Sequence, residues 1–328
     1  MRVAVTGSIA TDHLMTFPGR FSDSLVADKL DKISLSFLVD DLDIRRGGVA
    51  ANIAFGMGVL GLRPLLVGAV GPDFADYRSW LERHNVDTGS VHVSGVRHTA
   101  RFVCTTDLDQ NQIASFYPGA MSEAREIELG PVAERVGGLD LVVIGPNDPE
   151  AMIRHTQECR YRGFAFAADP SQQLARMSGE EIRSLVDGAA YLFTNEYEAA
   201  LTEQKTGWTS ADILDRVDMR VTTLGAKGAM VERKGDPAIY VDCPDEERKA
   251  DPTGVGDAFR AGFLAGVAWG LPPDRSCQIG SLLATFVIET IGTQEYEVTQ
   301  RNFLGRIAQA YGDAAAADIE PHLTTARH

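Results

Sequence analysis

Short apolar runs alternate with amphipathic helical patterns along much of this 328-residue sequence. Such runs predict strands buried on both faces, and a helix between consecutive strands predicts a largely parallel sheet covered by helices on both sides. The predicted strands are residues 63–70, 139–144, 164–168, 190–194 and 219–223, and the predicted helices are residues 74–84, 149–162, 178–186 and 210–214. We therefore expect an α/β fold in which ligands bind beyond the carboxyl ends of the strands.

Two stretches break this alternation. Residues 33–39 and 98–106 resemble strands with no helix nearby, and residues 112–117 follow the second stretch across a polar turn. That turn predicts a hairpin. We interpret these strands as a small sheet that serves as a lid, inserted into a single domain of residues 1–328. The lid is expected to be discontinuous, formed by about residues 9–46 and 97–121.

The charge of the chain excludes one class of partner. A net charge of −15 argues against a nucleic-acid-binding surface, although a single nucleotide needs only local amides and a metal. The sequence shows no Cys-x-x-Cys pair, no signal-like segment and no apolar run long enough to span a bilayer. We expect a cytoplasmic protein with reduced thiols and with no nucleic-acid or membrane partner.

The segment Asp-Pro-Thr-Gly-Val-Gly-Asp at residues 251–257 combines two chemical features. The small residues Gly254, Val255 and Gly256 let backbone N–H groups converge at the start of a predicted helix, where the helix dipole favours an anion. Asp257 stands in the first turn, placed to take a proton beside that anion. Together these features predict phosphoryl transfer to a hydroxyl. The alternative is a pair of turn glycines followed by a favourable helix N-terminal charge.

Two further motifs follow predicted strands. Thr223-Leu224-Gly225-Ala226-Lys227-Gly228 has glycines that allow a nucleotide to approach the backbone, although it also fits a plain β-turn. Asn195 and Glu198 open a helix, either as a helix cap alone or as groups that order Mg²⁺ through water.

The remaining candidates lie nearer the amino terminus. Gly47-Gly48 opens a helix of small residues in which Asn52 lies on the same face as Gly48. Asp12 is either a turn residue or a carboxylate that bridges two vicinal hydroxyls. Three aromatic side chains on the predicted lid strands fit either a core or a stacking platform for a flat ligand: Phe37, Phe102 and Phe116.

These motifs, in this order, resemble the ribokinase-like (PfkB) family of carbohydrate and nucleoside kinases. Residues 47–52 resemble its N-terminal signature and residues 251–257 its C-terminal signature, with Pro252 and Val255 in place of the commoner Thr and Ala. Pro252 has no N–H to donate, whereas Val255 keeps its amide. Further segments are similar to the actinobacterial adenosine kinases: residues 4–14, 115–124, 169–173 and 292–295.

The resemblance implies a role for each candidate residue. Asp257 is the base toward the ribose 5′-hydroxyl, and the amides of residues 254–256 form the anion hole. The ribose is held by Asp12, Gly48 and Asn52. The nucleobase is recognised by Ser8, Ser36, Gln172 and Gln173 and stacks between Phe102 and Phe116. ATP contacts Asn195, Gly256 and the loop Thr223, Leu224, Gly225, Ala226, Lys227 and Gly228, while Mg²⁺ is ordered by Glu198 through water, with Asn195.

The resemblance also implies an activity and an assembly. We expect an adenosine kinase of purine salvage, which transfers the γ-phosphate of ATP to adenosine and gives AMP and ADP, with Mg²⁺ and with K⁺ as a further activator. A homodimer through the lid sheet is expected, with Met121 reaching the pocket of the partner. A kinase for ribose or fructose is the nearest alternative, although its substrate offers Phe102 and Phe116 nothing flat to stack on. An inactive nucleoside sensor is a second alternative, disfavoured by the presence of both Asp257 and Glu198.

Overall fold

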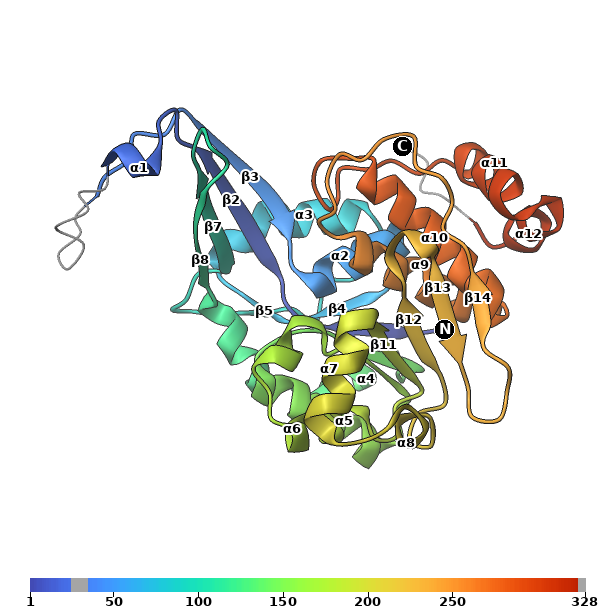
Figure 1. The fold of residues 1–328 in the computed structure, drawn as a ribbon. Coiled ribbons are helices and arrows are strands. Elements are labelled where there is room, and N and C mark those ends of the chain that lie inside the picture. Colours follow the sequence, from blue (N-terminus) through green and yellow to red (C-terminus); the bar gives the residue numbers. More distant parts are fainter. Residues whose placement is uncertain (25–34, 324–328) are drawn as a thin grey trace.

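A large sheet lies between two layers of helices, and a smaller sheet projects from this body (Figure 1). The computed structural model describes residues 1–24 and 35–323. Within these residues the large sheet has the strand order β14-β13-β12-β11-β10-β9-β1-β4. Its strands are β1 (Val3–Thr6), β4 (Leu65–Val67), β9 (Leu141–Ile144), β10 (Phe166–Ala168), β11 (Tyr191–Asn195), β12 (Arg220–Thr223), β13 (Ala229–Glu232) and β14 (Ile239–Val241). All pairings from β4 to β12 are parallel, whereas β13 pairs antiparallel with both of its neighbours.

Alternate residues of each central strand enter different hydrophobic cores. Val3 and Val5 of β1 pack into one core, and Ala4 between them packs into the other. This arrangement explains why the strands are apolar throughout, because both faces of a parallel sheet are covered. The helices of the first core are α2 (Val49–Val59), α3 (Ala75–Arg83), α9 (Val255–Ala268), α10 (Pro273–Ile288), α11 (Gln300–Tyr311) and α12 (Asp313–Ile319). Those of the second are α4 (Leu129–Val136), α5 (Pro149–Arg162), α6 (Gly179–Val186) and α8 (Ser210–Leu214), with α7 (Glu196–Thr206) beside them.

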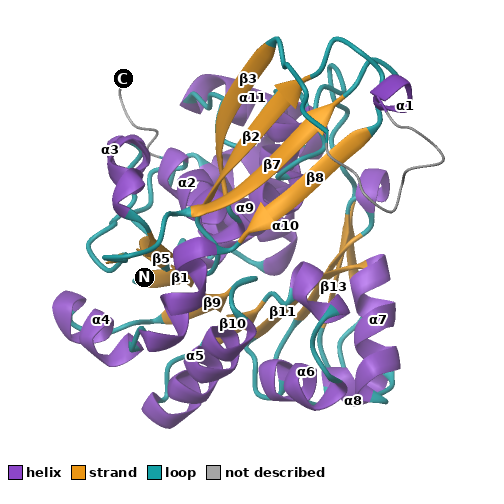
Figure 2. Ribbon diagram, turned by 90° about the vertical axis from the view of Figure 1, so that its left-hand side faces the viewer, coloured by secondary structure: helices purple, strands orange, loops and turns teal. Residues whose placement is uncertain are grey.

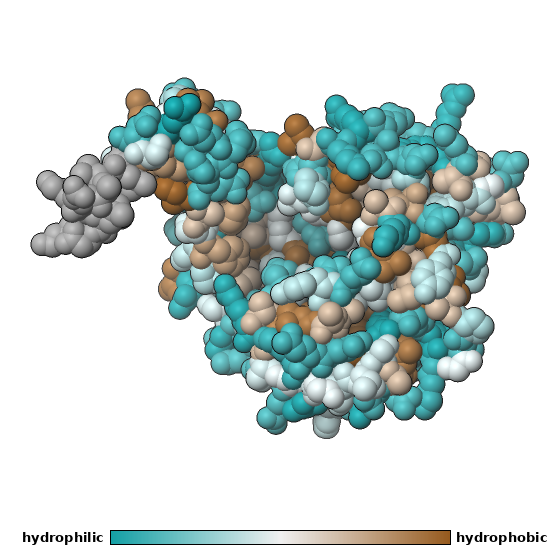
Figure 3. Space-filling model, in the orientation of Figure 1, coloured by the Kyte–Doolittle hydropathy of each residue, from teal (hydrophilic) through white to brown (hydrophobic). Residues whose placement is uncertain are grey.

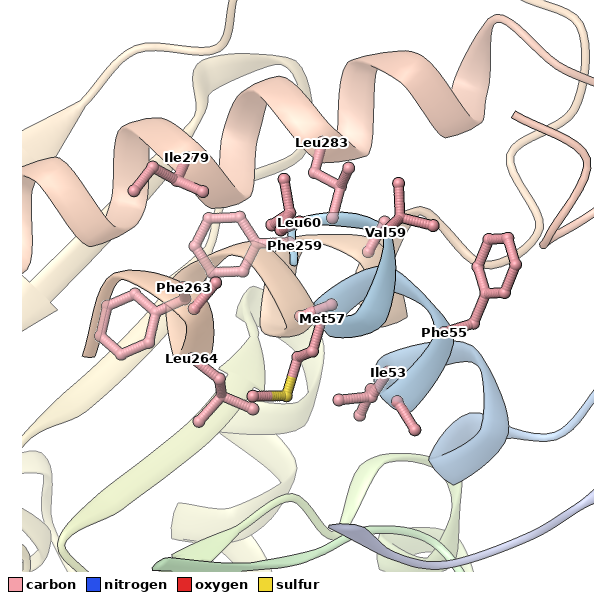
Figure 4. Packing of buried hydrophobic residues seen from close by; sticks show 14 of the residues in the cluster. Ile53, Phe55, Met57, Val59, Leu60, Phe259, Phe263, Leu264, Ile279 and Leu283 are labelled. Atoms are coloured by element: carbon pink, nitrogen blue, oxygen red, sulfur yellow. The ribbon is translucent and has the colours of Figure 1, made fainter. Parts of the chain in front are cut away.

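Helices α2, α9 and α10 pack closely in the first core. Met57 on α2, Phe263 on α9 and Leu283 on α10 belong to one buried cluster (Figure 4). Helix α2 is buried along most of its length because its small residues let neighbouring helices approach. This packing brings the amino-terminal turns of α2 and α9 together, as a hydrogen bond between Asn52 and Asp257 shows.

The smaller sheet is the lid, with strand order β3-β2-β7-β8. Its strands are β2 (Ala10–Thr16), β3 (Asp41–Gly47), β7 (Ala100–Thr106) and β8 (Gln112–Tyr117), and the short helix α1 (Phe21–Ser24) lies at its tip. Figure 2 shows the four strands side by side, raised above the helices of the body. A third, two-stranded sheet pairs β5 (Ala69–Val70) with β6 (His92–Val93), and helix α3 (Ala75–Arg83) lies between them in sequence.

The predicted α/β fold is confirmed, with two corrections in the strands. The strand predicted at 63–70 is divided, because β4 pairs with β1 whereas β5 pairs with β6. The strand predicted at 33–39 is wrong where the structure describes it. Residues 33 and 34 lie outside the described residues, and residues 35–39 form no strand. The lid strand that follows is β3, whose polar sequence Asp-Leu-Asp-Ile-Arg-Arg carries too few apolar residues to signal a strand.

The helices agree more closely with the sequence pattern. Helix α5 spans the predicted residues 149–162, and α3, α6 and α8 lie within one residue of the predicted bounds. The Ser178 capping box that predicted the start of α6 is present. No helix in the described part of the chain has the length and apolar character needed to cross a membrane.

Candidate active site

Four side chains form one row across the lid sheet. Asp12 on β2 is the register partner of Arg45 on β3 and of Phe102 on β7, and Phe102 is the partner of Phe116 on β8. Register partners on paired strands project from the same face of a sheet. A carboxylate and two aromatic rings are therefore presented together on one surface.

This face of the lid covers a cavity of about 560 Å³. The surface in Figure 3 is hollowed between the lid and the body. A cavity of this size suits a small organic ligand. The predicted site residues that line it are Ser8, Asp12, Gly48, Asn52, Phe102, Phe116, Gln172, Gln173, Gly254 and Asp257. Residues far apart in sequence, from the lid, from α2, from α9 and from the loop after β10, thus meet in one place.

Two predicted residues lie differently. Ser36 is exposed and is not among the residues that line the cavity. Phe37 packs against Phe17 and Phe21 instead, with ring centroids 4.8 and 4.9 Å apart. Met121 lines the cavity of its own chain, and its reach into a partner's pocket stays a prediction. The reason is the same for Ser36 and Phe37, because the strand expected there is absent.

Gly48 marks the passage from the lid into α2. Its φ of 94° lies in the region that favours glycine, and a Cβ there would lie 2.6 Å from the carbonyl oxygen of Ser8. The hydroxyl of Ser8 accepts a hydrogen bond from the amide of Val49 at 3.0 Å. Gly48 therefore allows β1, β3 and α2 to meet at the wall of the cavity, with Asn52 one turn further along.

Asp257 faces the cavity from the first turn of α9. Its Oδ2 accepts a hydrogen bond from Nδ2 of Asn52 at 2.8 Å. Burial raises the pKa of Asp257 to about 7, although the Asn52 hydrogen bond and the Arg260 guanidinium oppose that rise. A carboxyl with a pKa near neutrality is suited to accepting a proton in the physiological range.

The turn before Asp257 presents backbone amides at the start of α9. Gly254 precedes α9 with φ of 79°, and a Cβ there would lie 2.8 Å from Cγ2 of Thr293. The amides of the first helical turn, those of Val255, Gly256 and Asp257, cannot bond to the helix's own carbonyls, although the Val255 amide donates to the carbonyl of Pro252 at 3.4 Å. Such amides at a helix N-terminus favour a bound anion. The Asp257 carboxylate and these amides thus share one helical turn.

Asp12 is the second carboxylate of the cavity. Burial raises its pKa to about 6, while the Arg45 guanidinium opposes this and the Asp251 carboxylate adds to it. Asp12 therefore ionises close to neutral pH, next to Phe102 in the lid row.

A second group of residues lies beyond the ends of β11 and β12. Asn195 is the register partner of Thr223, so these two residues are neighbours at the edge of the sheet. Asn195 and Glu198 form a capping box, with hydrogen bonds of 2.8 Å in both directions. The loop from Leu224 to Gly228 is closed by a backbone hydrogen bond of 2.8 Å. Asn195 and Glu198 thus cap α7, and residues 224–228 form a closed turn.

A comparison with known proteins identifies the family. Residues 9–300 match the model of the pfkB family of carbohydrate kinases. The chain belongs to this family. It is 32% identical over 250 residues to a nucleoside kinase of Methanocaldococcus jannaschii, an alignment that covers 76% of this chain and 80% of that protein. The structure of a Burkholderia thailandensis nucleoside kinase in complex with inosine is similar, with a TM-score of 0.83 and 33% identity, covering 94% of this chain and 99% of that one. A Cryptococcus neoformans ribokinase, with 20% identity and a TM-score of 0.77, covers 93% of this chain and 99% of its own and shares the ribokinase-like fold.

The kinase has a buried cation that the sequence pattern did not reveal. Nε of Arg260 lies 2.7 Å from Oδ2 of Asp169, and the Arg260 side chain is 7% exposed and that of Asp169 0%. Nη2 of Arg260 lies 3.8 Å from Oε2 of Glu198. The available signal was an arginine within the mostly apolar sequence of α9. A buried charge needs a partner, so such an arginine predicts an acidic side chain nearby. Arg260 thus links the turn of Asp257 to the start of α7.

The chemistry of these carboxylates bears on a metal ion. No cluster of three or more His, Cys, Asp or Glu side chains that could enclose a metal occurs among the described residues. The buried Asp169 carboxylate is paired with Arg260, and Glu198 lies close by. This donor set fits Mg²⁺ held mostly through water, because Mg²⁺ keeps several waters and takes few carboxylates.

Proposed function

We propose that this chain is a nucleoside kinase that transfers the γ-phosphate of ATP to the 5′-hydroxyl of adenosine, giving AMP and ADP. The observation that carries the proposal is the lid row. It places Asp12, Phe102 and Phe116 over the same cavity that Asp257 enters from the other side. Acceptors for vicinal hydroxyls, flat rings for a base and a proton acceptor are the groups that a nucleoside needs.

The nucleoside would lie with its ribose toward the body. Asp12 and Asn52, with the backbone at Gly48, would hold the 2′- and 3′-hydroxyls, and the base would lie between Phe102 and Phe116. Gln173 donates from Nε2 to the carbonyl of Asn147 at 2.7 Å, and its Oε1 has no partner among the described residues. A carbonyl oxygen left in this way suits an N–H of a purine, such as the 6-amino group of adenine.

Phosphoryl transfer needs alignment and charge stabilisation more than covalent chemistry. Asp257 would accept the 5′-hydroxyl proton, and the amides of residues 254–256 would receive the charge that develops on the phosphoryl group. ATP would lie along Asn195, Thr223 and the loop to Gly228. When bound, Mg²⁺ would neutralise phosphate charge, and Glu198 with Asn195 would order its waters. A K⁺ requirement stays a prediction.

A coupled assay of ADP formation tests this proposal. Adenosine, inosine, guanosine, cytidine, ribose and fructose would each be supplied with ATP and Mg²⁺, with and without K⁺. We expect adenosine to give the highest kcat/KM and the free sugars to be at least about a hundredfold poorer, because stacking on two aromatic rings contributes several kcal/mol. Higher turnover of inosine would keep the nucleoside kinase but replace adenosine as its substrate.

Two outcomes would reject the nucleoside kinase. Turnover of ribose or fructose without turnover of any nucleoside would identify a sugar kinase on the same fold. Binding of adenosine with no ADP formation would identify a sensor, and calorimetry on the same samples separates that outcome from an inactive preparation.

A further inference from the structure

We propose that Gln294 and Trp80 are positioning residues that fix the direction in which the Asn52 amide faces, and so keep its N–H toward Asp257. The proposal rests on the proposed function, because it assumes that Asp257 is the base. Both side chains lie outside the turn of residues 254–256 and outside the lid sheet. Gln294 is 1% exposed, and Trp80 is half-buried on α3.

The chain of hydrogen bonds begins at a group with a fixed polarity. The indole Nε1 of Trp80 donates to Oε1 of Gln294 at 3.1 Å. An indole nitrogen is only a donor, so it must face the carbonyl oxygen of the glutamine amide. The NH₂ group of Gln294 is thereby directed to the opposite side.

That NH₂ group has two acceptors. Nε2 of Gln294 donates to Oδ1 of Asn52 at 2.9 Å and to Oη of Tyr77 at 2.6 Å. The Tyr77 hydroxyl in turn donates to the carbonyl of Gly47 at 2.9 Å, and a carbonyl is only an acceptor. Both ends of this series of hydrogen bonds are therefore fixed, because the indole N–H can only donate and the backbone carbonyl can only accept.

The orientation of the Asn52 amide follows from this series of hydrogen bonds. The Thr293 hydroxyl lies 2.9 Å from Oδ1 of Asn52 and 3.0 Å from the carbonyl oxygen of Arg46, and its single proton serves one of them at a time. With the Gln294 donor at Oδ1, the Nδ2 group of Asn52 faces Asp257 at 2.8 Å. A reversed amide would put Oδ1 against a carboxylate and Nδ2 against the NH₂ group of Gln294. Asn52 is only 6% exposed, so bulk water offers little compensation for these two repulsions.

The orientation of Asn52 affects the base because the donated hydrogen bond favours the ionised carboxylate. The charged groups that face Asp257 are Arg260 on its own helix, Asp169 after β10 and Glu198 on α7. Arg260 and the Asn52 donor lower the pKa of Asp257, whereas burial and the two carboxylates raise it. Weakening the Asn52 donor therefore moves the pKa of Asp257 upward and leaves more of the base protonated at neutral pH.

The test compares three variants by the pH dependence of kcat/KM, each against wild type in the same buffers so that titration of the substrates cancels. Trp80→Phe removes the indole N–H, Gln294→Met removes donor and acceptor, and Gln294→Glu places an acceptor against Oδ1 of Asn52. We expect the acidic limb of the kcat/KM profile to move to higher pH in that order, by about half a pH unit or more for Gln294→Met. Turnover near pH 6.5 should fall by about threefold to tenfold.

Phe55→Leu is the matched control. Phe55 packs against Trp80 with ring centroids 6.0 Å apart and carries no polar group. Its variant should lower the melting temperature without moving the acidic limb. Unshifted limbs in all the Trp80 and Gln294 variants that fold would overturn the proposal, as would an equal shift in Phe55→Leu. If the Gln294 variants fail to fold, Trp80→Phe decides the test alone.

Failure of the proposed function would look different. In that case the wild-type chain would phosphorylate no nucleoside, or Asp257→Asn would keep wild-type turnover. Loss of turnover in Asp257→Asn together with unmoved limbs in the Trp80 and Gln294 variants would reject only the positioning role.

Discussion

The Arg260 guanidinium and the Asp169 carboxylate form a buried ion pair, with Nε 2.7 Å from Oδ2. Arg260 also donates from Nη1 to the carbonyl of Gly256 at 3.1 Å. The pair therefore joins the loop after β10 to the turn that carries Asp257. One cation lies among three carboxylates, those of Asp169, Glu198 and Asp257, and it lowers the pKa of both Asp169 and Asp257.

Replacing Arg260 should change both the free energy of unfolding and the pH dependence of turnover. Arg260→Met leaves the Asp169 carboxylate buried without a cation, and we expect a loss of about 3–5 kcal/mol of unfolding free energy at pH 8. The acidic limb of turnover should move to higher pH. Urea denaturation and pH profiles measure the two effects. Arg20→Met is the control, because the exposed pair of Arg20 with Asp109 should contribute less than about 1 kcal/mol. Similar losses in both variants would contradict the importance of the buried pair.

Asp257→Asn should abolish turnover and yet stabilise the fold at high pH. The pKa of Asp257 is raised to about 7 in the folded chain, so its contribution to stability is complete below pH 4 and is lost as the pH rises toward 7. We expect the variant to be more stable than wild type by up to about 4 kcal/mol at pH 8, and by little at pH 4. Turnover should fall by several orders of magnitude while adenosine still binds. Thermal denaturation at both pH values checks the sign, and a variant less stable at pH 8 would contradict it.

Asp12 should make nucleoside affinity depend on pH. Its pKa is raised to about 6, and a protonated carboxyl gives up part of its capacity to accept two hydroxyls. The KM for adenosine should therefore rise as the pH falls below 6. Asp12→Asn should raise KM about tenfold at pH 7.5 and remove the dependence. Initial rates between pH 5 and pH 8 test this, and a variant that keeps the rise in KM would assign it to another group.

The aromatic rings of the lid should select a nucleoside over a free sugar. Phe102→Ala and Phe116→Ala should each raise the KM for adenosine by about tenfold or more, because each removes a stacking surface. Any weak turnover of ribose should change little, since ribose has no flat group. Phe37→Ala is the control, because Phe37 packs against Phe17 and Phe21 at the lid tip. An equal effect of Phe37→Ala on adenosine would point to general loosening of the lid.

The sequence predicted best those features that depend on a local pattern of residues. Apolar strands, the Ser178 cap and the hairpin of 98–117 could be predicted because each pattern is local. The strand β3 could not, because its residues are mostly polar and its order comes from pairing with β2. The series of hydrogen bonds from Trp80 to Asp257 could not be predicted from the sequence either, since it joins residues more than two hundred positions apart through side-chain geometry.

The outer face of the lid should hold two copies of the chain together. In the register of the lid strands, Leu42 and Ile44 on β3 and Ile113 on β8 project from the face opposite Asp12, and they are 50%, 57% and 50% exposed. Exposed apolar side chains gathered on one face favour association. We expect gel filtration with light scattering to give a dimer, and Ile44→Asp to give a monomer that remains folded. Asp109→Lys, at the turn of the lid hairpin, should leave the dimer unchanged. A wild-type monomer at every concentration tested would contradict the dimer, whereas loss of the dimer in both variants would place the contact at the tip of the lid instead of its outer face.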